Sequence, residues 1–190
     1  MEYVKDLETP AVIVDLDIME KNLKHTAELA RNAGVKLRPH CKTHKSIWIA
    51  KKQLEYGAAG ITVAKLSEAE VMVNGGIDDI LVAYPIVGEK KLKRLEKLIK
   101  RASIIVCTDS VEVSQGLSDL GVSMGRKIKT YVQVNSGLQR CGREPGEETV
   151  ELVKSIIGLP GIEIIGLITH AGFSYDYVGE DSIRAAAHKE

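Results

Sequence analysis

The sequence has no excess charge of either sign. Its 26 Lys and Arg residues are balanced by 26 Asp and Glu residues, so the formal net charge of the 190-residue chain is zero. Proteins that bind nucleic acid or an anionic membrane through their general surface carry a basic excess. The balance therefore argues against both classes of partner, and we expect small molecules or other protein chains instead.

The chain also lacks long apolar runs and is poor in cysteine. It has no stretch of about 20 apolar residues that could span a membrane, and its first six residues lack the basic and apolar regions of a signal peptide. The three cysteines, Cys41, Cys107 and Cys141, are odd in number and widely spaced, which argues against a disulfide framework. These absences predict a cytoplasmic protein, and the length predicts one globular unit over residues 1–190.

Common nucleotide-binding and hydrolase motifs are missing as well. No Gly-x-x-x-x-Gly-Lys phosphate loop and no nucleophile elbow occurs, and Gly57, Gly60 and the Gly75-Gly76 pair lack the spacing of a dinucleotide fingerprint. His40, Cys41 and His44 are close enough in sequence to suggest a metal, but strand alternation would turn Cys41 away from His40. No second cluster adds ligands, so we predict no metal site in this chain.

What the sequence does contain is a repeated alternation of short apolar runs with amphipathic helical stretches, the pattern of βα units. Gly34, Gly57, Gly121 and Gly158 are expected to stop helices. Ser67 and Glu70 match a capping box at the start of another helix. The predicted strands are 11–16, 35–42, 59–64, 80–84, 103–107, 128–135 and 162–170. The predicted helices, besides the one that follows Ser67, are 18–32, 47–54, 89–100, 111–120, 147–157 and 180–189.

Counted from residue 35, the pattern gives about six strand and helix pairs, whereas a closed (β/α)8 barrel needs eight. We predict an α/β fold of the TIM-barrel type that is incomplete, with an open doubly wound sheet as the geometric alternative. The chain ends inside a predicted helix, so a truncated barrel is expected, with no C-terminal β domain.

The run Arg38-Pro39-His40-Cys41-Lys42-Thr43-His44-Lys45 stands at the end of a predicted strand, where ligands bind in parallel α/β folds. A period of two places Arg38, His40 and Lys42 on one face. A lysine at a strand end is usually a solvated surface charge. In a desolvated pocket, however, Arg38, His40 and Lys45 would each disfavour the charged ammonium of Lys42, which would make this amine a nucleophile toward aldehydes.

Three further polar residues follow later strands. Arg140 lies in a glycine-flanked loop and is either part of a surface turn or a bidentate clamp for a carboxylate. His170 is either a satisfied core histidine or a functional one. Tyr175 is predicted either to cap the core or to contact a planar ligand.

These segments resemble a known family. The octapeptide around Lys42 is similar to the cofactor-lysine signature of D-threonine aldolases and eukaryotic-type D-serine dehydratases, which share the alanine racemase N-terminal barrel and are fold type III pyridoxal-phosphate enzymes. The resemblance runs in order through nearly the whole chain. It includes Leu7-Glu8-Thr9-Pro10-Ala11, Gly57-Ala58-Ala59-Gly60-Ile61-Thr62-Val63-Ala64, Gly137-Leu138-Gln139-Arg140-Cys141-Gly142 and Gly166-Leu167-Ile168-Thr169-His170 with Tyr175.

The resemblance implies pyridoxal 5'-phosphate held as an internal aldimine on Lys42. The implied catalytic residues are Lys42 and His40, and the implied cofactor-binding residues are Lys42, Arg140, His170 and Tyr175. The implied activity is that of a lyase that cleaves or dehydrates D-3-hydroxy amino acids. The expected partners are the D-amino acid substrate and a second copy of the chain in a homodimer.

Members of this family are much longer, with further barrel strands that contact the phosphate and a C-terminal β domain that carries divalent metal ligands. We therefore expect this chain by itself to bind the cofactor weakly and to turn over little. A metal is expected only in a full-length protein. The alternatives are an amino-acid racemase, a single-barrel pyridoxal-phosphate carrier, and a non-catalytic barrel that assembles with another chain or dimerises through unpaired edge strands.

Overall fold

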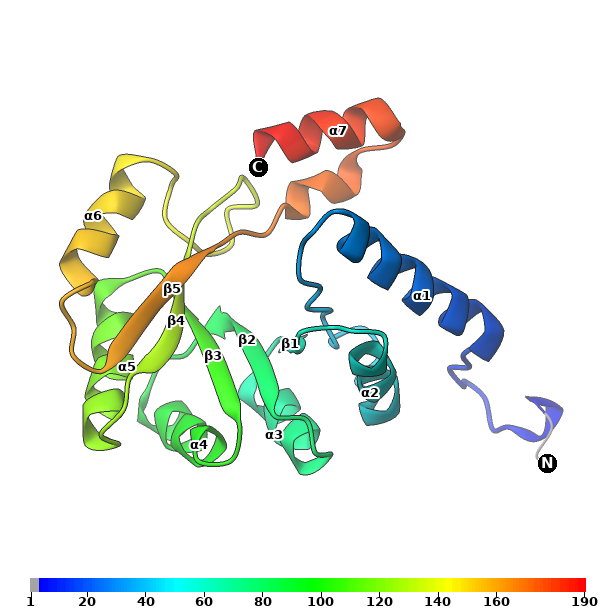
Figure 1. Ribbon diagram of the computed structural model, residues 1–190, viewed down its shortest axis with the longest axis horizontal. Helices are drawn as coiled ribbons and strands as arrows, with labels where there is room; N and C mark the ends of the chain where they lie inside the picture. Colours follow the sequence, from blue (N-terminus) through cyan, green and yellow to red (C-terminus); the bar gives the residue numbers. More distant parts are fainter. Residues whose placement is uncertain (1–3) are drawn as a thin grey trace.

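The computed structural model describes residues 4–190, and within this range five parallel strands form one sheet in chain order (Figure 1). Each strand pairs in parallel with the next one along the chain. A helix follows every strand, which is how parallel neighbours are connected. The predicted α/β class is therefore confirmed. The strands are β1 (Ile61–Val63), β2 (Asp79–Pro85), β3 (Ser103–Thr108), β4 (Ile128–Gln133) and β5 (Ile162–Ile168).

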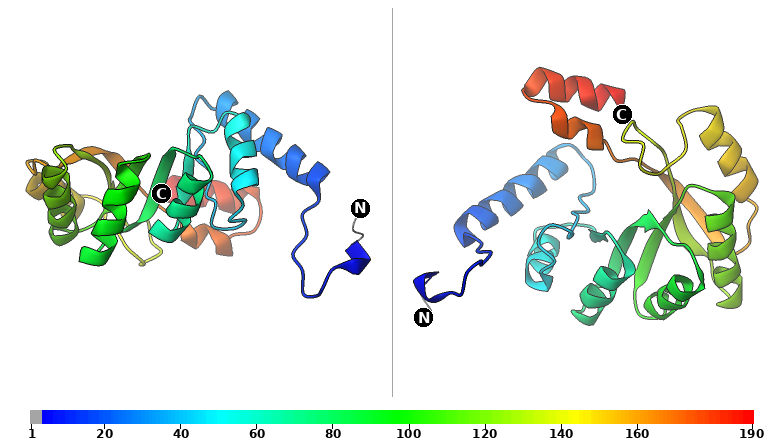
Figure 2. Two further views of the ribbon diagram at one scale, coloured as in Figure 1. Left: turned by 90° about the horizontal axis from the view of Figure 1, so that it is seen from below. Right: turned by 180° about the vertical axis from the view of Figure 1, so that it is seen from behind.

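The helices from α2 to α6 form an arc around the outside of the strands, and the views in Figure 1 and Figure 2 show the side near α1 and α7 left open. All seven predicted helices are formed. They are α1 (Leu16–Asn32), α2 (Ile47–Glu55), α3 (Leu66–Asn74), α4 (Glu89–Ile99), α5 (Val111–Ser123), α6 (Glu147–Ile156) and α7 (Glu180–Lys189). Two short 3-10 turns, η1 (Val4–Asp6) and η2 (Gly172–Asp176), complete the described elements.

The hydrophobic core lies between the strands and this arc of helices. Its fully buried side chains include Ile61, Leu95, Leu117 and Ile156. A second, smaller cluster of Leu81, Ile105 and Cys107 lies apart from this core. Strand residues point alternately to the two faces, so β2 and β3 contribute apolar side chains to both clusters. The smaller cluster therefore occupies the inner face of the sheet, where part of the functional cavity described below is also found.

One predicted strand is absent. Residues 11–15 have no regular structure, and α1 begins at Leu16, where the Asp15 carboxylate accepts the Ile18 N–H at 3.0 Å. This segment leads from η1 to α1 at a distance from the sheet (Figure 2), and Val12 is 98% exposed. An apolar run becomes a strand only when a neighbouring strand pairs with its backbone, and no described strand lies beside this segment.

The predicted strand at 35–42 is formed only in part. The carbonyls of Leu37 and Pro39 accept the N–H groups of Ala59 and Thr62, both at 2.8 Å, and a single bridge joins His40 to Thr62. The chain thus advances by two residues from Leu37 to Pro39 but by three from Ala59 to Thr62, and the extra residue forms a bulge at Gly60. A Cβ on Gly60 would overlap the Arg38 guanidinium, so glycine is required there. The bulge and Pro39, which lacks an N–H, prevent a regular ladder.

Gly121 does not stop its helix as predicted, because α5 continues to Ser123. A Cβ on Gly121 would overlap the Gly161 carbonyl, and a Cβ on Gly161 would overlap the Ser118 carbonyl. The Gly161 N–H also bonds to Ser118 Oγ at 3.0 Å. Gly121 is therefore needed for the close approach of two backbones and not for a left-handed turn.

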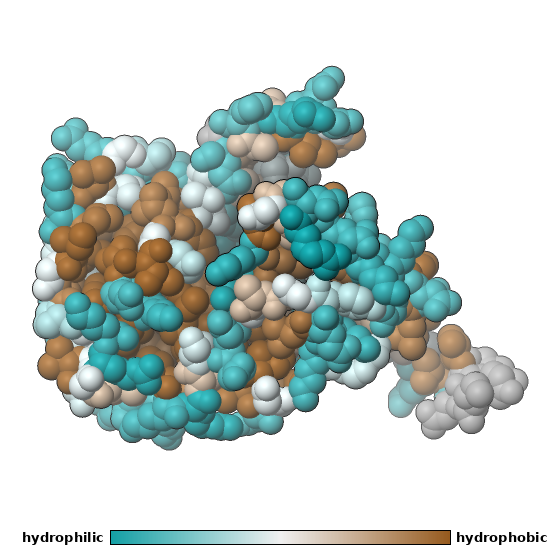
Figure 3. Space-filling model, viewed as in Figure 1, coloured by the Kyte–Doolittle hydropathy of each residue, from teal (hydrophilic) through white to brown (hydrophobic). Residues whose placement is uncertain are grey.

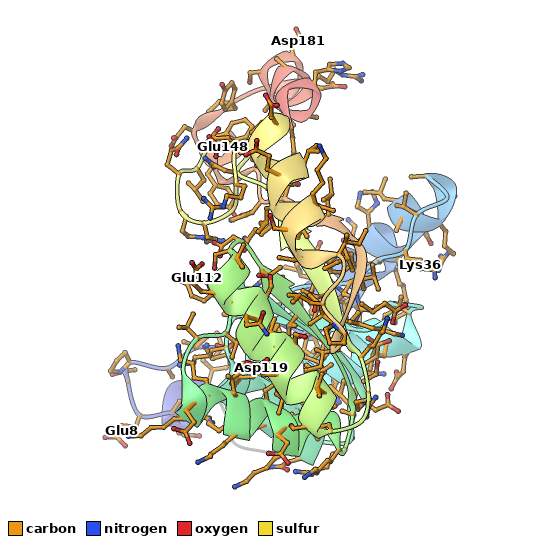
Figure 4. All side chains as sticks on the ribbon, turned by 90° about the vertical axis from the view of Figure 1, so that its left-hand side faces the viewer. Glu8, Lys36, Glu112, Asp119, Glu148 and Asp181 are labelled. Carbon is orange, nitrogen blue, oxygen red and sulfur yellow. The ribbon has the colours of Figure 1, made fainter. Side chains whose placement is uncertain are left out.

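The outer surface of α5 and α6 carries both acidic and apolar side chains. Figure 4 shows Glu112 and Asp119 on α5 and Glu148 on α6, and Val122 and Val150 are exposed on the same helices. Figure 3 shows apolar residues gathered on the side where β5 lies, and Leu167 of β5 is exposed there. Within residues 4–190, no helix combines the length and apolar character that a membrane crossing would need.

Candidate active site around Lys42

A cavity of about 360 Å3 lies mainly beside the carboxyl ends of the strands. This is within the range of about 300–1,000 Å3 that is typical of small-molecule sites. Its wall combines apolar side chains from β2 and β5 with basic side chains from the connecting segments. The lining residues are Arg38, His40, Lys42, Thr62, Ala64, Leu81, Ala83, Tyr84, Gln133, Arg140, Ile168, Thr169 and His170. Four of the predicted site residues, Lys42, His40, Arg140 and His170, therefore share one cavity.

Lys42 is presented by a turn that follows the His40 bridge, not by a strand. The Lys45 N–H donates to the Cys41 carbonyl at 2.8 Å and closes the turn, and Lys45 adopts a left-handed φ of 51°. The backbone N–H of Lys42 donates a hydrogen bond to His40 Nδ1 at 3.2 Å. Lys42 and His40 are thus joined through the backbone of the turn, and both side chains reach the cavity.

Two basic neighbours that were predicted to disfavour the Lys42 ammonium have carboxylate partners of their own. Arg38 forms an ion pair with Asp79 at 2.7 Å, and Lys45 forms one with Glu68. A cation whose charge is offset by a carboxylate repels a second cation much less. The sequence did not predict these two ion pairs, and the effect of Arg38 and Lys45 on Lys42 stays a prediction. Lys42 in turn acts on two histidines of the site, His40 and His170.

Glu68 fixes the lysine turn from the side of α3. Its side chain is nearly buried, and its Oε2 accepts the Ala64 N–H at 2.8 Å while Oε1 binds Lys45. Burial by itself would raise the pKa of Glu68, but the hydrogen bonds from Lys45 and Ala64 hold it below its usual range. The predicted capping box of Ser67 and Glu70 is wrong, because the N-cap of α3 is Lys65, which makes no side-chain cap bond. Glu70 binds Arg94 instead, at 2.7 Å.

The histidines of the site favour the neutral form. Burial lowers the pKa of His40, and the Lys42 ammonium lowers it further. Burial also lowers the pKa of His170, with Arg140 and Lys42 as additional causes. Because His40 Nδ1 accepts the Lys42 N–H, the proton of the neutral imidazole is on Nε2. His40 is therefore arranged to exchange a proton at Nε2, and His170 stays uncharged beside two cations.

These shifts predict a loss of stability below neutral pH. Burial lowers the folded-state pKa of His40, His44 and His170 below the value of 6.5 in the unfolded chain. The unfolded chain therefore takes up protons first as the pH falls, and stability that is complete above pH 6.5 declines below it. The urea midpoint should fall between pH 7.5 and 5.5, and His44→Gln should flatten this decline. A midpoint that is constant over this interval would contradict the shifts.

Arg140 lies in a loop that is fixed to its neighbours at several points. Asn135 Oδ1 accepts the N–H groups of Gly137 and Gln139, both at 3.1 Å. The Gly142 N–H donates to Asp109 Oδ2 at 3.2 Å. Arg140 itself is exposed and lines the cavity, and its role as a clamp for a ligand carboxylate or phosphate stays a prediction.

Tyr175 does not line the cavity. It lies in η2, is 75% exposed, and meets His170 edge to face with ring centroids 6.0 Å apart. Its ring therefore reaches the site only through its contact with His170. The predicted contact between Tyr175 and a ligand stays a prediction.

Sequence reasoning missed Gln133, the last residue of β4. Gln133 is buried and lines the cavity between Arg140 and the inner face of the sheet. β4 also contains an exposed Lys129 and a buried Thr130, so no signal in the sequence distinguished this glutamine from the other polar residues of the strand.

The three cysteines are free thiols. Burial raises the pKa of Cys41 to about 11 and the pKa of Cys107 to about 12, so both are unreactive thiols near neutral pH. Among the described residues, no group of three or more His, Cys, Asp or Glu side chains is arranged to hold a metal ion.

Comparison with known proteins identifies the domain. A family model described as alanine racemase, N-terminal domain, matches residues 14–189. The chain is 33% identical over 169 residues to 3-hydroxy-D-aspartate aldolase of Paracoccus denitrificans, which covers 88% of this chain and 44% of the relative. It is 32% identical over 187 residues to D-threo-3-hydroxyaspartate dehydratase of Delftia sp., with 97% and 49% covered.

A solved structure gives the same result. The crystal structure of D-threonine aldolase from Filomicrobium marinum superposes with a TM-score of 0.93 at 38% identity, over 98% of this chain and 50% of that one. The chain thus spans about half the length of the curated relatives it matches. The resemblance that was drawn from the octapeptide and the later loops is confirmed, and the chain belongs to the alanine racemase N-terminal domain family.

Proposed function

We propose that this chain contributes the lysine side of a pyridoxal 5'-phosphate-dependent lyase that acts on D-3-hydroxy amino acids, by aldol cleavage or by dehydration. The observation that carries the proposal is the position of Lys42, which lies with His40, His170 and Arg140 around one cavity. The names of the matched relatives, two aldolases and a dehydratase of D-hydroxy amino acids, support this substrate class.

The cavity fits the cofactor in three respects. Lys42 supplies a primary amine, the group that captures an aldehyde. The cations that line the wall suit a phosphate and a carboxylate. Apolar side chains of Ala83, Leu81 and Ile168 offer a surface for a planar ring. The donor set therefore agrees with a planar, anionic aldehyde.

The bound cofactor would serve as the electron sink when a bond to the substrate α-carbon breaks. Lys42 would hold the cofactor through its side-chain amine, and the same amine, when neutral and not bound in this way, can accept a proton. Neutral His40 can exchange a proton through Nε2 beside Lys42. Arg140 would bind an anionic oxygen, and His170 would border the ligand without adding a positive charge. The choice between aldol cleavage and dehydration depends on the group that acts at the β-hydroxyl.

We also propose that the whole protein is an active lyase, forms a homodimer and is cytoplasmic. The chain spans about half of its relatives, so we expect weak cofactor binding and low turnover from these residues alone. A racemase is the alternative reaction, since it would use the same lysine. A non-catalytic barrel protein would lack covalent capture at Lys42 altogether.

Borohydride reduction in the presence of pyridoxal 5'-phosphate, followed by peptide mapping, tests the proposal. We expect a pyridoxyl group on the peptide that contains Lys42. A label that is absent, or that is spread over many lysines, would count against cofactor binding at this site. Product analysis with D-threonine, D-serine and alanine then separates the lyase from the racemase, because glycine or pyruvate is expected from the lyase and only inverted alanine from the racemase.

A further inference from the structure

Gln133 has a buried amide whose hydrogen-bonding capacity is not met. Its side chain is 5% exposed at the end of β4. The Oε1 atom is buried and has no hydrogen-bond partner among residues 4–190. The same side chain lines the cavity that contains Lys42 and Arg140. The side chain that carries this unpaired acceptor thus borders the proposed site.

The neighbours of Gln133 make this unpaired amide unfavourable in the ligand-free protein. Gln133 pairs in register with Ile168 of β5, and Leu81 and Ala83 line the same cavity. A buried polar atom without a partner destabilises the folded state, whereas an apolar side chain of the same shape would not. Such a feature is expected where a ligand supplies the missing partner.

We infer that Gln133 Oε1 accepts a hydrogen bond from the ligand that Lys42 holds, so that Gln133 is a ligand-binding residue of this site. The inference rests on the proposed function. The guanidinium groups of Arg38 and Arg140 can only donate hydrogen bonds and therefore select ligand oxygens. Gln133 adds an acceptor, which recognises a hydroxyl or N–H donor on the ligand. A site with both donors and an acceptor distinguishes a hydroxylated heteroaromatic aldehyde, which has both kinds of group, from a simple anion, which has acceptors only.

A structural water is the competing explanation. Gln133 also borders a small hollow of about 10 Å3, and Ser136 Oγ, which lines the same hollow, is a second buried atom without a partner within the described range. This volume is near the minimum for one water, which could bridge the two atoms. In that case the amide would stabilise the ligand-free protein and would not contact the ligand.

The variant Gln133→Met separates these explanations, because methionine keeps the length of the side chain and removes the acceptor. The probe is pyridoxal 5'-phosphate, titrated by absorbance against the full chain. We expect the dissociation constant to rise about tenfold, the equivalent of about 1.4 kcal/mol. The thermal midpoint of the ligand-free protein should stay unchanged or rise by about 2–4 °C. Gln115→Met, at an exposed position of α5, should change neither quantity.

A ligand-free midpoint that falls while the dissociation constant stays unchanged would assign the amide to a water and overturn the inference. Gln133→Leu repeats both measurements with a different apolar shape, in case the methionine variant does not fold. If the parent chain is labelled at Lys42 but both variants bind as tightly as it does, only the role of Gln133 fails. If the parent chain is not labelled at Lys42, the proposed function fails and this inference fails with it.

Discussion

Replacing Lys42 with methionine should reduce covalent capture of pyridoxal 5'-phosphate at the 38–45 turn to background. Capture requires a primary amine at the cavity, and methionine has a side chain of similar length without one. Lys42 is exposed and lines the cavity that His40, Arg140 and His170 share. The amount of pyridoxyl label on this peptide after borohydride reduction, measured by mass spectrometry, is the quantity that should disappear.

Lys51→Met provides the matched control. Lys51 is an exposed lysine on α2, nine positions along the chain, and it does not line the cavity. Its removal should leave the label on the Lys42 peptide unchanged. Both variants should unfold within about 0.5 kcal/mol of the parent chain, because exposed side chains contribute little to stability. If the Lys42→Met variant is still labelled at another lysine of the 38–45 turn, reactivity in this turn does not depend on an amine at the cavity.

The helices and most strands of this domain could be predicted from local pattern. α4 and α6 show apolar residues at helical spacing, and β3 is a short apolar run between turn signals. The segment at 11–16 has a similar apolar run but forms no strand. Its backbone would need a partner strand, and the sequence of the segment does not contain that information. Glycine at position 60 is likewise favoured by a distant residue, because a Cβ there would come too close to the Asp79 carbonyl.

The sequence predicts those residues of the site that directly follow the carboxyl end of a strand. His40, Lys42, Arg140 and His170 come after different strands, and the parallel sheet brings those ends together. The charges around Lys42 could not be predicted, because Arg38 finds Asp79 and Lys45 finds Glu68, residues 41 and 23 positions away. Gln133 was missed because its importance lies in an unmade hydrogen bond, which only the packed structure reveals.

Among residues that do not line the cavity, Glu68 should have a large effect on both stability and cofactor capture when it is replaced. Glu68→Ala removes the acceptor of the Ala64 N–H and the partner of Lys45. Leaving one buried N–H unpaired and losing a charged hydrogen bond should lower the free energy of unfolding by about 2 kcal/mol. The turn that presents Lys42 would also lose an anchor. Capture of pyridoxal 5'-phosphate at Lys42 should become slower by about tenfold or more, because small displacements of a reacting group have large effects on rate.

Three single variants and one double variant separate anchoring of the turn from general destabilisation. Glu70→Ala removes an ion pair of the same type, with Arg94, on the exposed side of the helix, and it should alter stability by about 0–1 kcal/mol with no change in the capture rate.

Glu68→Gln keeps an acceptor for Ala64 but loses the charge that holds Lys45. If the turn is anchored through Lys45, Glu68→Gln and Lys45→Met should slow capture by the same factor, and combining them should add nothing. Additive effects would show instead that Glu68 and Lys45 act on the turn independently.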